Sequence, residues 1–182
     1  KQFLVQSYYP ISILFRKILL PVLLVYVFIL PIILRFLPLQ KIYFGYKFSV
    51  SEIVFIWVSG AITILLIVNV LLKNMWGRVR PNDISYFDGV DGFTPWYKIS
   101  NACASNCSFV SGDSSVGFML VVFYFITEKN TYLYLGLILG SLLGFIRIAA
   151  GGHFFSDIIF SQIVVTITIL TCFVLYKKLY DK

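Results

Sequence analysis

Charged and reactive side chains are scarce in this chain of 182 residues. Only 13% of the residues are charged, eight are acidic, three are cysteine, and His153 is the single histidine. A structural zinc site needs a full tetrahedral set of Cys and His ligands, so this inventory argues against one, and we expect no metal or other cofactor. The scarcity of charge also argues against a soluble globular domain, in which about 25% of residues are charged.

Apolar residues are abundant instead. They make up 59% of the chain, and the mean hydropathy is +0.90. Crossing about 30 Å of hydrocarbon takes about 20 mostly apolar residues in a helix. Five runs are candidates, the third of them short, and they cover residues 11–34, 50–72, 113–127, 132–148 and 153–176. Because the runs do not alternate like the strands of a membrane barrel, we predict an all-α polytopic membrane bundle of five to six transmembrane helices, forming a single domain over residues 1–182.

The net charge of +7 raises the question of a nucleic-acid partner. The fifteen Lys and Arg residues form neither a stripe nor a basic tail, so we exclude nucleic acid as a partner. In a membrane protein such an excess typically sets orientation and contacts anionic lipid. Membrane lipids are therefore the expected partners, and no obligate protein partner is indicated.

The polar residues concentrate in one loop, residues 73–112, between the second and third runs. Alternate crossings place Lys73, Ser111–Gly112, Arg147 and His153 on the same face of the membrane as this loop. The opposite face receives another set of cations, namely Arg35, Lys41, Lys47, Lys129, Lys177, Lys178 and Lys182. Because cytoplasmic loops carry an excess of Lys and Arg, we predict that the polar loop lies outside the cytoplasm and that the C-terminus is cytoplasmic.

The first run fits this orientation poorly. Five crossings put the N-terminus outside, together with Lys1, Arg16 and Lys17. Either the first run is partly interfacial, or a further helix upstream of Lys1 restores a cytoplasmic N-terminus.

The cysteines give one open question. Cys103 and Cys107 lie in the polar loop and could form a disulfide if that loop faces an oxidising compartment. Cys172 lies in an apolar run, where packing is its simplest role.

A first polar cluster follows the second apolar run and contains Lys73, Arg78 and Arg80. If the helix continues for two further turns, Lys73 and Arg80 project to similar sides, with Arg78 as an auxiliary. Such a fork of cations would hold a phosphate through charge-assisted hydrogen bonds. The alternative is a basic collar whose side chains only reach toward lipid headgroups.

A second cluster, Ser111 and Gly112 with Asp113, opens the third run. The start of a helix exposes free N–H groups, and a glycine lets an anion approach the backbone. The alternative is an ordinary N-cap, for which Ser and Asp are the usual residues.

A third cluster lies between the last two runs. His153 and Asp157 are four residues apart, so the carboxylate can accept one imidazole N–H and leave the other ring nitrogen facing outward. Arg147 ends the preceding run, and Gly151 and Gly152 permit the sharp return that brings it beside the ring. The alternative is a satisfied polar pair, but charges at membrane depth cost about 2.5–3.5 kcal/mol each, which argues for function.

Together the three clusters resemble the three-part phosphatase signature of the type 2 phosphatidic acid phosphatases, which share their site with the vanadium haloperoxidases. The resemblance covers the chain from the second run to the fifth. It implies a metal-independent mechanism in which His153 attacks phosphorus to form a phosphohistidine and Asp157 orients the ring. It also implies which residues hold the phosphoryl oxygens: Lys73, Arg80, Ser111, Gly112 and Arg147.

The chain departs from the family pattern at three positions. Val110 stands where the family usually has proline, and Ile146 where it usually has serine. Asp113 takes the place of the family's second histidine, the acid that protonates the leaving group. A carboxylic acid could serve if it were held protonated, although nearby Lys and Arg favour the carboxylate. Asp113 therefore suggests a good leaving group, as in a glycosyl phosphate or a pyrophosphate.

The small size and the stretch Asn106 to Ser115 resemble the bacterial lipid A phosphatases, so lipid A 1-phosphate is the first substrate expected. The alternatives within the enzyme class are an undecaprenyl pyrophosphate phosphatase, a phosphatidylglycerophosphate phosphatase and a lipid phosphotransferase. Outside that class, the protein could be a lipid-binding or transport module whose cations only grip headgroups. The spacing of His153 and Asp157 argues against such a module, because binding a headgroup does not require an oriented imidazole.

Overall fold

The structure is a computed structural model that describes residues 9–37 and 45–180. Lys1, Lys41 and Lys182, which entered the charge pattern, lie outside these ranges. The described residues form helices, turns and loops without a β-strand, and an isolated bridge joins Ile84 to Asp91. The predicted all-α membrane bundle is confirmed.

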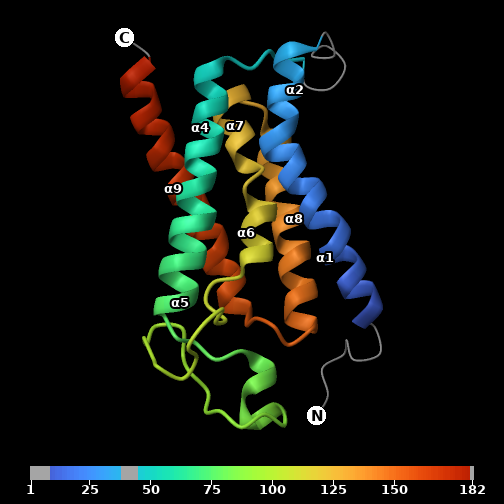
Figure 1. The fold of residues 1–182 in the computed structure, drawn as a ribbon, viewed down its shortest axis with the longest axis vertical. Coiled ribbons are helices and arrows are strands. Elements are labelled where there is room, and N and C mark those ends of the chain that lie inside the picture. Colours follow the sequence, from blue (N-terminus) through green and yellow to red (C-terminus); the bar gives the residue numbers. More distant parts are fainter. Residues whose placement is uncertain (1–8, 38–44, 181–182) are drawn as a thin grey trace.

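Four helical spans are long and apolar enough to cross a membrane (Figure 1). A shorter apolar helix, Gly112–Thr127, corresponds to the short third run. The four long spans are Phe15–Phe36, Val50–Met75, Asn130–Ala149 and Phe155–Tyr180. They agree with the predicted runs to within a few residues at each end.

Two of the spans are divided by π-helical stretches. The first consists of α1 (Tyr9–Leu24), the π-helical Val25–Ile29 and α2 (Leu30–Phe36). The second consists of α4 (Val50–Gly60), the π-helical Ala61–Leu72 and α5 (Lys73–Met75). The remaining helices are α6 (Gly112–Phe118), α7 (Val121–Thr127), α8 (Asn130–Ala149) and α9 (Phe155–Tyr180).

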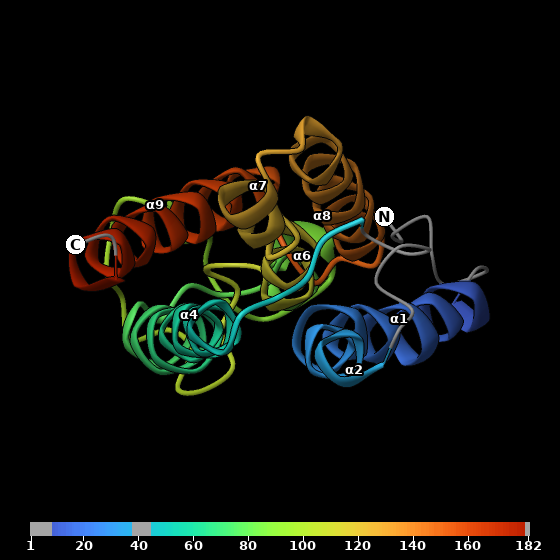
Figure 2. The ribbon, with the colours of Figure 1, turned by 90° about the horizontal axis from the view of Figure 1, so that it is seen from above.

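The pair α6 and α7 runs through the centre of the bundle, with α4, α8, α9 and the first span around it (Figure 2). Its residues from Phe118 to Phe123 are all buried. Contact with α8 is close because glycines meet: a Cβ on Gly117 would lie 2.6 Å from the Cα of Gly140. The Ser114 hydroxyl donates to the Gly140 carbonyl at 2.6 Å. These contacts fix the start of α6 against α8.

One end of the bundle carries all the predicted site elements. In Figure 1 the end of α5, the start of α6, the end of α8, the start of α9 and the first turns of α1 lie together at the bottom. The end of α2, the start of α4 and the link from α7 to α8 lie at the opposite end. The predicted sharing of one face is thus observed, and the orientation of that face in a cell stays a prediction.

The second helix does not continue as far as Arg80, which was the condition for Lys73 and Arg80 to project to similar sides. α5 ends at Met75, and Gly77 has a φ of 66°. A Cβ at Gly77 would lie 1.7 Å from the Ser100 carbonyl oxygen, so only glycine allows the loop to pack here. The chain then leaves the helix axis and passes through two short 3₁₀ turns, Pro81–Asp83 and Ser85–Phe87.

Candidate active site

His153 lies in the turn between α8 and α9 and is almost completely buried. Its Nδ1 lies 2.6 Å from the carbonyl oxygen of Ser108. Because a carbonyl can only accept, Nδ1 carries the hydrogen and the lone pair is on Nε2. The backbone of the polar loop therefore selects the tautomer that leaves Nε2 as the nucleophilic nitrogen.

Asp157 approaches the same ring without taking that hydrogen bond. Its Oδ2 is 3.6 Å from Nδ1 of His153. Oδ2 instead accepts from the Ser108 hydroxyl at 2.6 Å and from the Phe154 N–H at 2.9 Å. The predicted direct hydrogen bond between imidazole and carboxylate is replaced by the Ser108 carbonyl. Asp157 is left to act on the ring through its negative charge, which would stabilise an imidazolium.

Arg78 is the buried cation that balances Asp157. Its Nη1 donates to Oδ1 of Asp157 and, at 2.8 Å, to the Ser156 hydroxyl. Its Nε donates to the Thr94 carbonyl at 3.0 Å, and the guanidinium lies 4.2 Å from the centre of the Phe154 ring. These contacts point Arg78 at the carboxylate, so its predicted auxiliary role on the phosphate finds no support in its placement.

Replacing Arg78 by Ala is expected to destabilise the protein. The substitution leaves the Asp157 carboxylate, which is 0% exposed, without its cation. Removing one member of a buried ion pair typically lowers the free energy of unfolding by about 3–5 kcal/mol. Thermal unfolding in detergent would measure the loss, with the exposed loop cation Lys98→Ala as control. Equal stability of the two variants would contradict this role of Arg78.

Arg147 ends α8 and packs against the glycine turn. Gly151 adopts a φ of 68°, and the Gly152 N–H donates to the Arg147 carbonyl at 2.9 Å. A Cβ on Gly152 would lie 2.3 Å from Nη2 of Arg147, so the guanidinium occupies the space that the missing side chain leaves. The glycine turn thus reverses the direction of the chain, as the sequence predicted, and it leaves room for the Arg147 side chain.

Lys73 and the start of α6 meet at Gly112. A Cβ on Gly112 would lie 2.9 Å from the Lys73 Nζ, so the ammonium covers the first residue of the helix. Ser111 is the N-cap, and its own N–H donates to the Asp157 carbonyl at 3.4 Å. Of the pair predicted to bind phosphate, Ser111 therefore anchors the helix start, and Gly112 is the residue whose backbone lies beside the cation.

Asp113 is held between two arginines. Its Oδ2 is 3.1 Å from Nε of Arg16 and 3.5 Å from Nε of Arg147. Asp113 therefore forms ion pairs with an arginine of α1 and an arginine of α8. The general-acid role stays a prediction, and the observed contacts favour a different one, in which Asp113 positions the arginines.

Arg16 was not among the predicted site residues. It lies on α1, far from the other clusters in sequence, and its side chain is 57% exposed. From the sequence, Arg16 was only a cation on the unexpected side of the first run. Only the packing of α1 beside α6 brings it to Asp113.

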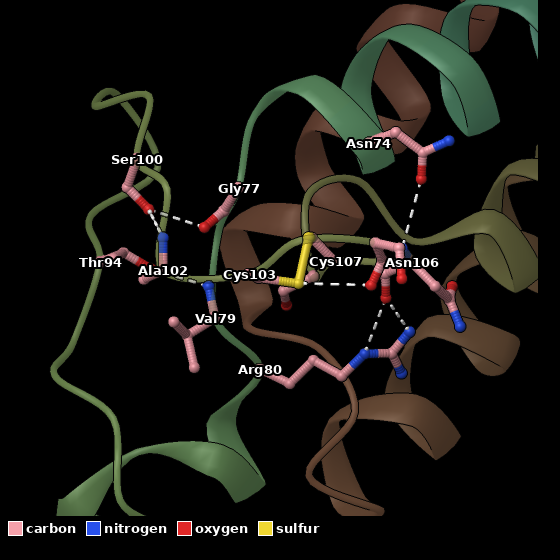
Figure 3. Close-up of a disulfide and its surroundings, with 12 residues drawn as sticks. Asn74, Gly77, Val79, Arg80, Thr94, Ser100, Ala102, Cys103, Asn106 and Cys107 are labelled. Atoms are coloured by element: carbon pink, nitrogen blue, oxygen red, sulfur yellow. Dashed lines mark hydrogen bonds between the residues drawn. A yellow bond between two sulfur atoms is a disulfide. The ribbon is translucent and has the colours of Figure 1, made fainter.

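Arg80 lies in the polar loop, where its side chain points toward Asn106 (Figure 3). Its Nε and Nη2 donate to the Asn106 carbonyl at 3.1 and 2.6 Å. Asn106 lies within the short loop closed by the disulfide between Cys103 and Cys107, whose Cα atoms are 5.7 Å apart. The sequence left undecided whether Cys103 and Cys107 are joined, and in the structure they form a disulfide.

The cations converge electrostatically on the imidazole. Burial lowers the pKa of His153, the negative charge of the nearby Asp157 raises it, and the positive charges of Arg147 and Arg80 lower it further. The net pKa of His153 is lower than that of an ordinary histidine, so the ring is neutral near pH 7. Lys73 belongs to the same group of cations, because Arg80, Arg147 and Arg16 interact with it electrostatically.

The sequence comparisons agree with this arrangement. The profile of the PAP2 superfamily matches residues 54–181, which include every predicted site residue. The chain belongs to the PAP2 superfamily. The predicted resemblance to the type 2 phosphatidic acid phosphatases is thereby confirmed, while Arg16 lies outside the matched region. No solved structure gives a significant match to the chain.

Three curated relatives share a name. The chain is 40% identical over 121 residues to the lipid A 4′-phosphatase of Francisella tularensis subsp. novicida, covering 64% of this chain and 53% of that protein. It is 35% identical over 104 residues to the lipid A 4′-phosphatase of Rhizobium etli, covering 54% and 40%. It is 34% identical over 98 residues to that of Rhizobium leguminosarum, covering 52% and 42%. The chain thus spans about half the length, or less, of the relatives it matches. These names refer to the 4′ position, so the predicted 1-phosphatase subgroup is not supported.

Proposed function

We propose that this protein is a lipid phosphatase that removes a headgroup phosphate from lipid A, at the 4′ position. The observation that carries the proposal is a buried imidazole whose Nδ1 is held by the Ser108 carbonyl beside Asp157, and on which the charges of Arg147 and Arg80 act. The names of the relatives support lipid A as the substrate and the 4′ position as the site of hydrolysis. The positive-inside pattern supports a periplasmic site in the bacterial inner membrane, with the C-terminus in the cytoplasm.

The proposed reaction has two steps. Nε2 of His153 attacks phosphorus, the bond to the sugar oxygen breaks, and the leaving oxygen takes a proton from solvent or from an acid in the site. The phosphohistidine carries a positive imidazolium, which the nearby Asp157 carboxylate stabilises. Water then attacks the phosphorus, and phosphate leaves together with the restored neutral ring.

In the proposed reaction, side-chain cations take the place of a metal ion and stabilise negative charge on the phosphoryl oxygens. Lys73, Arg80, Arg147 and the Gly112 backbone would hold the phosphoryl oxygens as charge builds in the transition state. A cation at about 4 Å from a phosphate charge contributes about 4 kcal/mol at an effective dielectric near 20. Several such contacts acting together would account for much of the rate enhancement.

Purified lipids test the proposal. Phosphate release would be followed from lipid A, undecaprenyl pyrophosphate and phosphatidylglycerophosphate, with and without an acceptor lipid, and with EDTA. We expect EDTA-resistant loss of the 4′-phosphate of lipid A, located by tandem mass spectrometry of the product. Loss of the 1-phosphate would restore the original substrate prediction, and transfer to the acceptor would identify a phosphotransferase. Binding of every lipid without release of phosphate would identify a lipid-binding module.

Replacing Gly152 by Ala is expected to weaken catalysis and leave the fold intact. The new Cβ would displace the Arg147 guanidinium, which is the mobile end of a long side chain, and the backbone need not move. Misplacing one phosphate ligand should lower kcat/KM by about 10-fold to 100-fold.

Gly92→Ala is the matched control for this substitution, because nothing lies within 4 Å of its added Cβ. Steady-state phosphate release and thermal unfolding would be measured for both variants. Full activity of Gly152→Ala would contradict the placement of Arg147 at the phosphate.

Asp113→Asn separates the two roles of this carboxylate. If Asp113 positions Arg16 and Arg147, the amide should lower kcat/KM by about 10-fold on every substrate, whatever the leaving group. Single-turnover rates would be compared for the sugar 4′-phosphate, an alkyl ester, and a pyrophosphate. A much larger loss on the alkyl ester would instead show that Asp113 donates the proton to the leaving oxygen.

A further inference from the structure

The short disulfide loop lies directly against a predicted phosphate ligand. The carbonyl oxygen of Asn106 accepts both the Nε and the Nη2 hydrogens of Arg80 (Figure 3). Asn106 itself has a φ of 49°, a left-handed conformation that side-chain-bearing residues adopt infrequently. The carbonyl therefore points at the guanidinium only while the loop keeps an uncommon backbone shape.

The loop is also tied to the end of the second membrane span. The Asn106 N–H donates to Oδ1 of Asn74 at 3.3 Å, and the Cys107 N–H donates to the Lys73 carbonyl at 3.1 Å. One side of the loop thus rests on α5, and its other side holds Arg80. This loop therefore connects Lys73 to Arg80, although no continuous helix joins the two residues.

We propose that the disulfide between Cys103 and Cys107 is a positioning element of the phosphate site, holding the Asn106 carbonyl so that it orients Arg80. The inference rests on the proposed function, in which Arg80 binds the phosphoryl group. With two N–H groups fixed by one carbonyl, the guanidinium plane is set and its other N–H groups are available to the phosphate. Opening the disulfide lets Asn106 leave the left-handed conformation, and Arg80 loses its acceptor.

A purely stabilising disulfide explains the loop less well. The two cysteines are separated by 4 positions, and the entropy that a disulfide removes from the unfolded chain grows with loop length, so this bond stabilises the fold less than a bond closing a long loop would. The neighbouring catalytic contacts also have their own anchors. Ser108, which holds His153, is fixed by its N–H on the Arg78 carbonyl at 2.8 Å and by its hydroxyl on Asp157. Loss of the disulfide should therefore act on Arg80 and leave the imidazole in place.

A double-mutant cycle tests the kinetic consequence. The pair Cys103→Ser/Cys107→Ser would be made in the wild-type and in the Arg80→Ala background, with Cys172→Ser as the cysteine control. In the wild-type background kcat/KM for phosphate release from lipid A should fall by about 10-fold or more, because a phosphate ligand is misplaced. In the Arg80→Ala background the same pair should cause almost no further loss. An equal loss in both backgrounds, or no loss in the first, overturns the proposal.

Chemical labelling tests the placement of Arg80 without any assay of turnover. Phenylglyoxal would be used on the full chain in detergent, and modification of Arg80 and Arg147 quantified by mass spectrometry. Removal of the disulfide should raise labelling of Arg80 and leave labelling of Arg147 unchanged. Unchanged labelling of Arg80 refutes the inference even in an active enzyme. If instead no lipid is hydrolysed by the wild type, the proposed function fails while the labelling still decides the placement.

Discussion

His153→Ala is expected to reduce phosphate release from lipid A by at least about 1,000-fold, with binding of the lipid retained. Under the proposed function, the His153 imidazole supplies the nucleophilic nitrogen, and the charges of Arg147 and Arg80 act on this ring. Removing it would take away the atom proposed to form the covalent intermediate, while Lys73, Arg80 and Arg147 would still be present to hold the headgroup. Turnover on purified lipid and binding to vesicles that contain the same lipid would be measured in parallel.

The outcome of this substitution also separates the enzyme from a binding module. His153 donates to the Ser108 carbonyl, so thermal unfolding of the variant must be compared with that of the wild type. A folded His153→Ala protein that hydrolyses lipid at the wild-type rate would remove His153 as nucleophile. Loss of lipid binding together with loss of turnover would indicate that the His153 ring contributes to binding of the headgroup.

Asp157→Asn is expected to lower kcat by about 100-fold to 1,000-fold. In hydrolases where the carboxylate itself fixes the histidine tautomer, the same exchange costs about 10,000-fold. Here the Ser108 carbonyl fixes the tautomer, so the loss should be smaller and should reflect the missing negative charge beside the imidazolium. The comparison requires folded protein, because the Arg78 guanidinium loses its counter-charge in this variant.

The pH dependence of kcat/KM tests the same interaction between Asp157 and His153. Burial lowers the pKa of His153, so wild-type kcat/KM should stay level as the pH falls through about 6.5 and decline only at lower pH. Asp157 raises that pKa, so its replacement by Asn should move the acid limb to still lower pH. An acid limb that moves upward in Asp157→Asn would mean that another group controls it.

Much of the fold follows from local sequence. Apolar runs of membrane-spanning length predict the helices, and helix ends follow from nearby residues. Ser49 and Glu52, for example, form a reciprocal cap at the start of α4, where the Ser49 hydroxyl accepts from the Glu52 N–H at 3.2 Å. Alternation of the crossings then predicts which clusters share one end of the bundle. These features are local or depend only on the order of the segments.

The details that sequence reasoning missed all depend on contacts between distant segments. The end of the helix before Arg80 could not be predicted, because nothing beside Gly77 in sequence reveals the Ser100 backbone packed against it. The tautomer of His153 is set by a carbonyl 45 positions away, and Arg16 joins the site only through the packing of α1. Ser and Arg are common residues, so their spacing alone gave no signal of these roles.

The position of the scissile phosphate was the prediction that the comparisons changed. Asp113 suggested an anomeric leaving group on the assumption that it replaces a histidine acid. In the structure Asp113 forms ion pairs with Arg16 and Arg147. These ion pairs give no information about the leaving group. The chemistry of this side chain therefore does not oppose a 4′-phosphate.

The most direct measurement is the trapping of the covalent intermediate. Wild-type protein would be mixed with lipid A labelled in its phosphate, quenched in base within milliseconds to seconds, and digested for mass spectrometry. We predict an acid-labile phosphate on the peptide that contains His153, rising and decaying with turnover and absent from His153→Ala. Steady turnover without phosphate on His153 at any quench time, or inversion of configuration at a chiral phosphorus, would contradict the proposed mechanism.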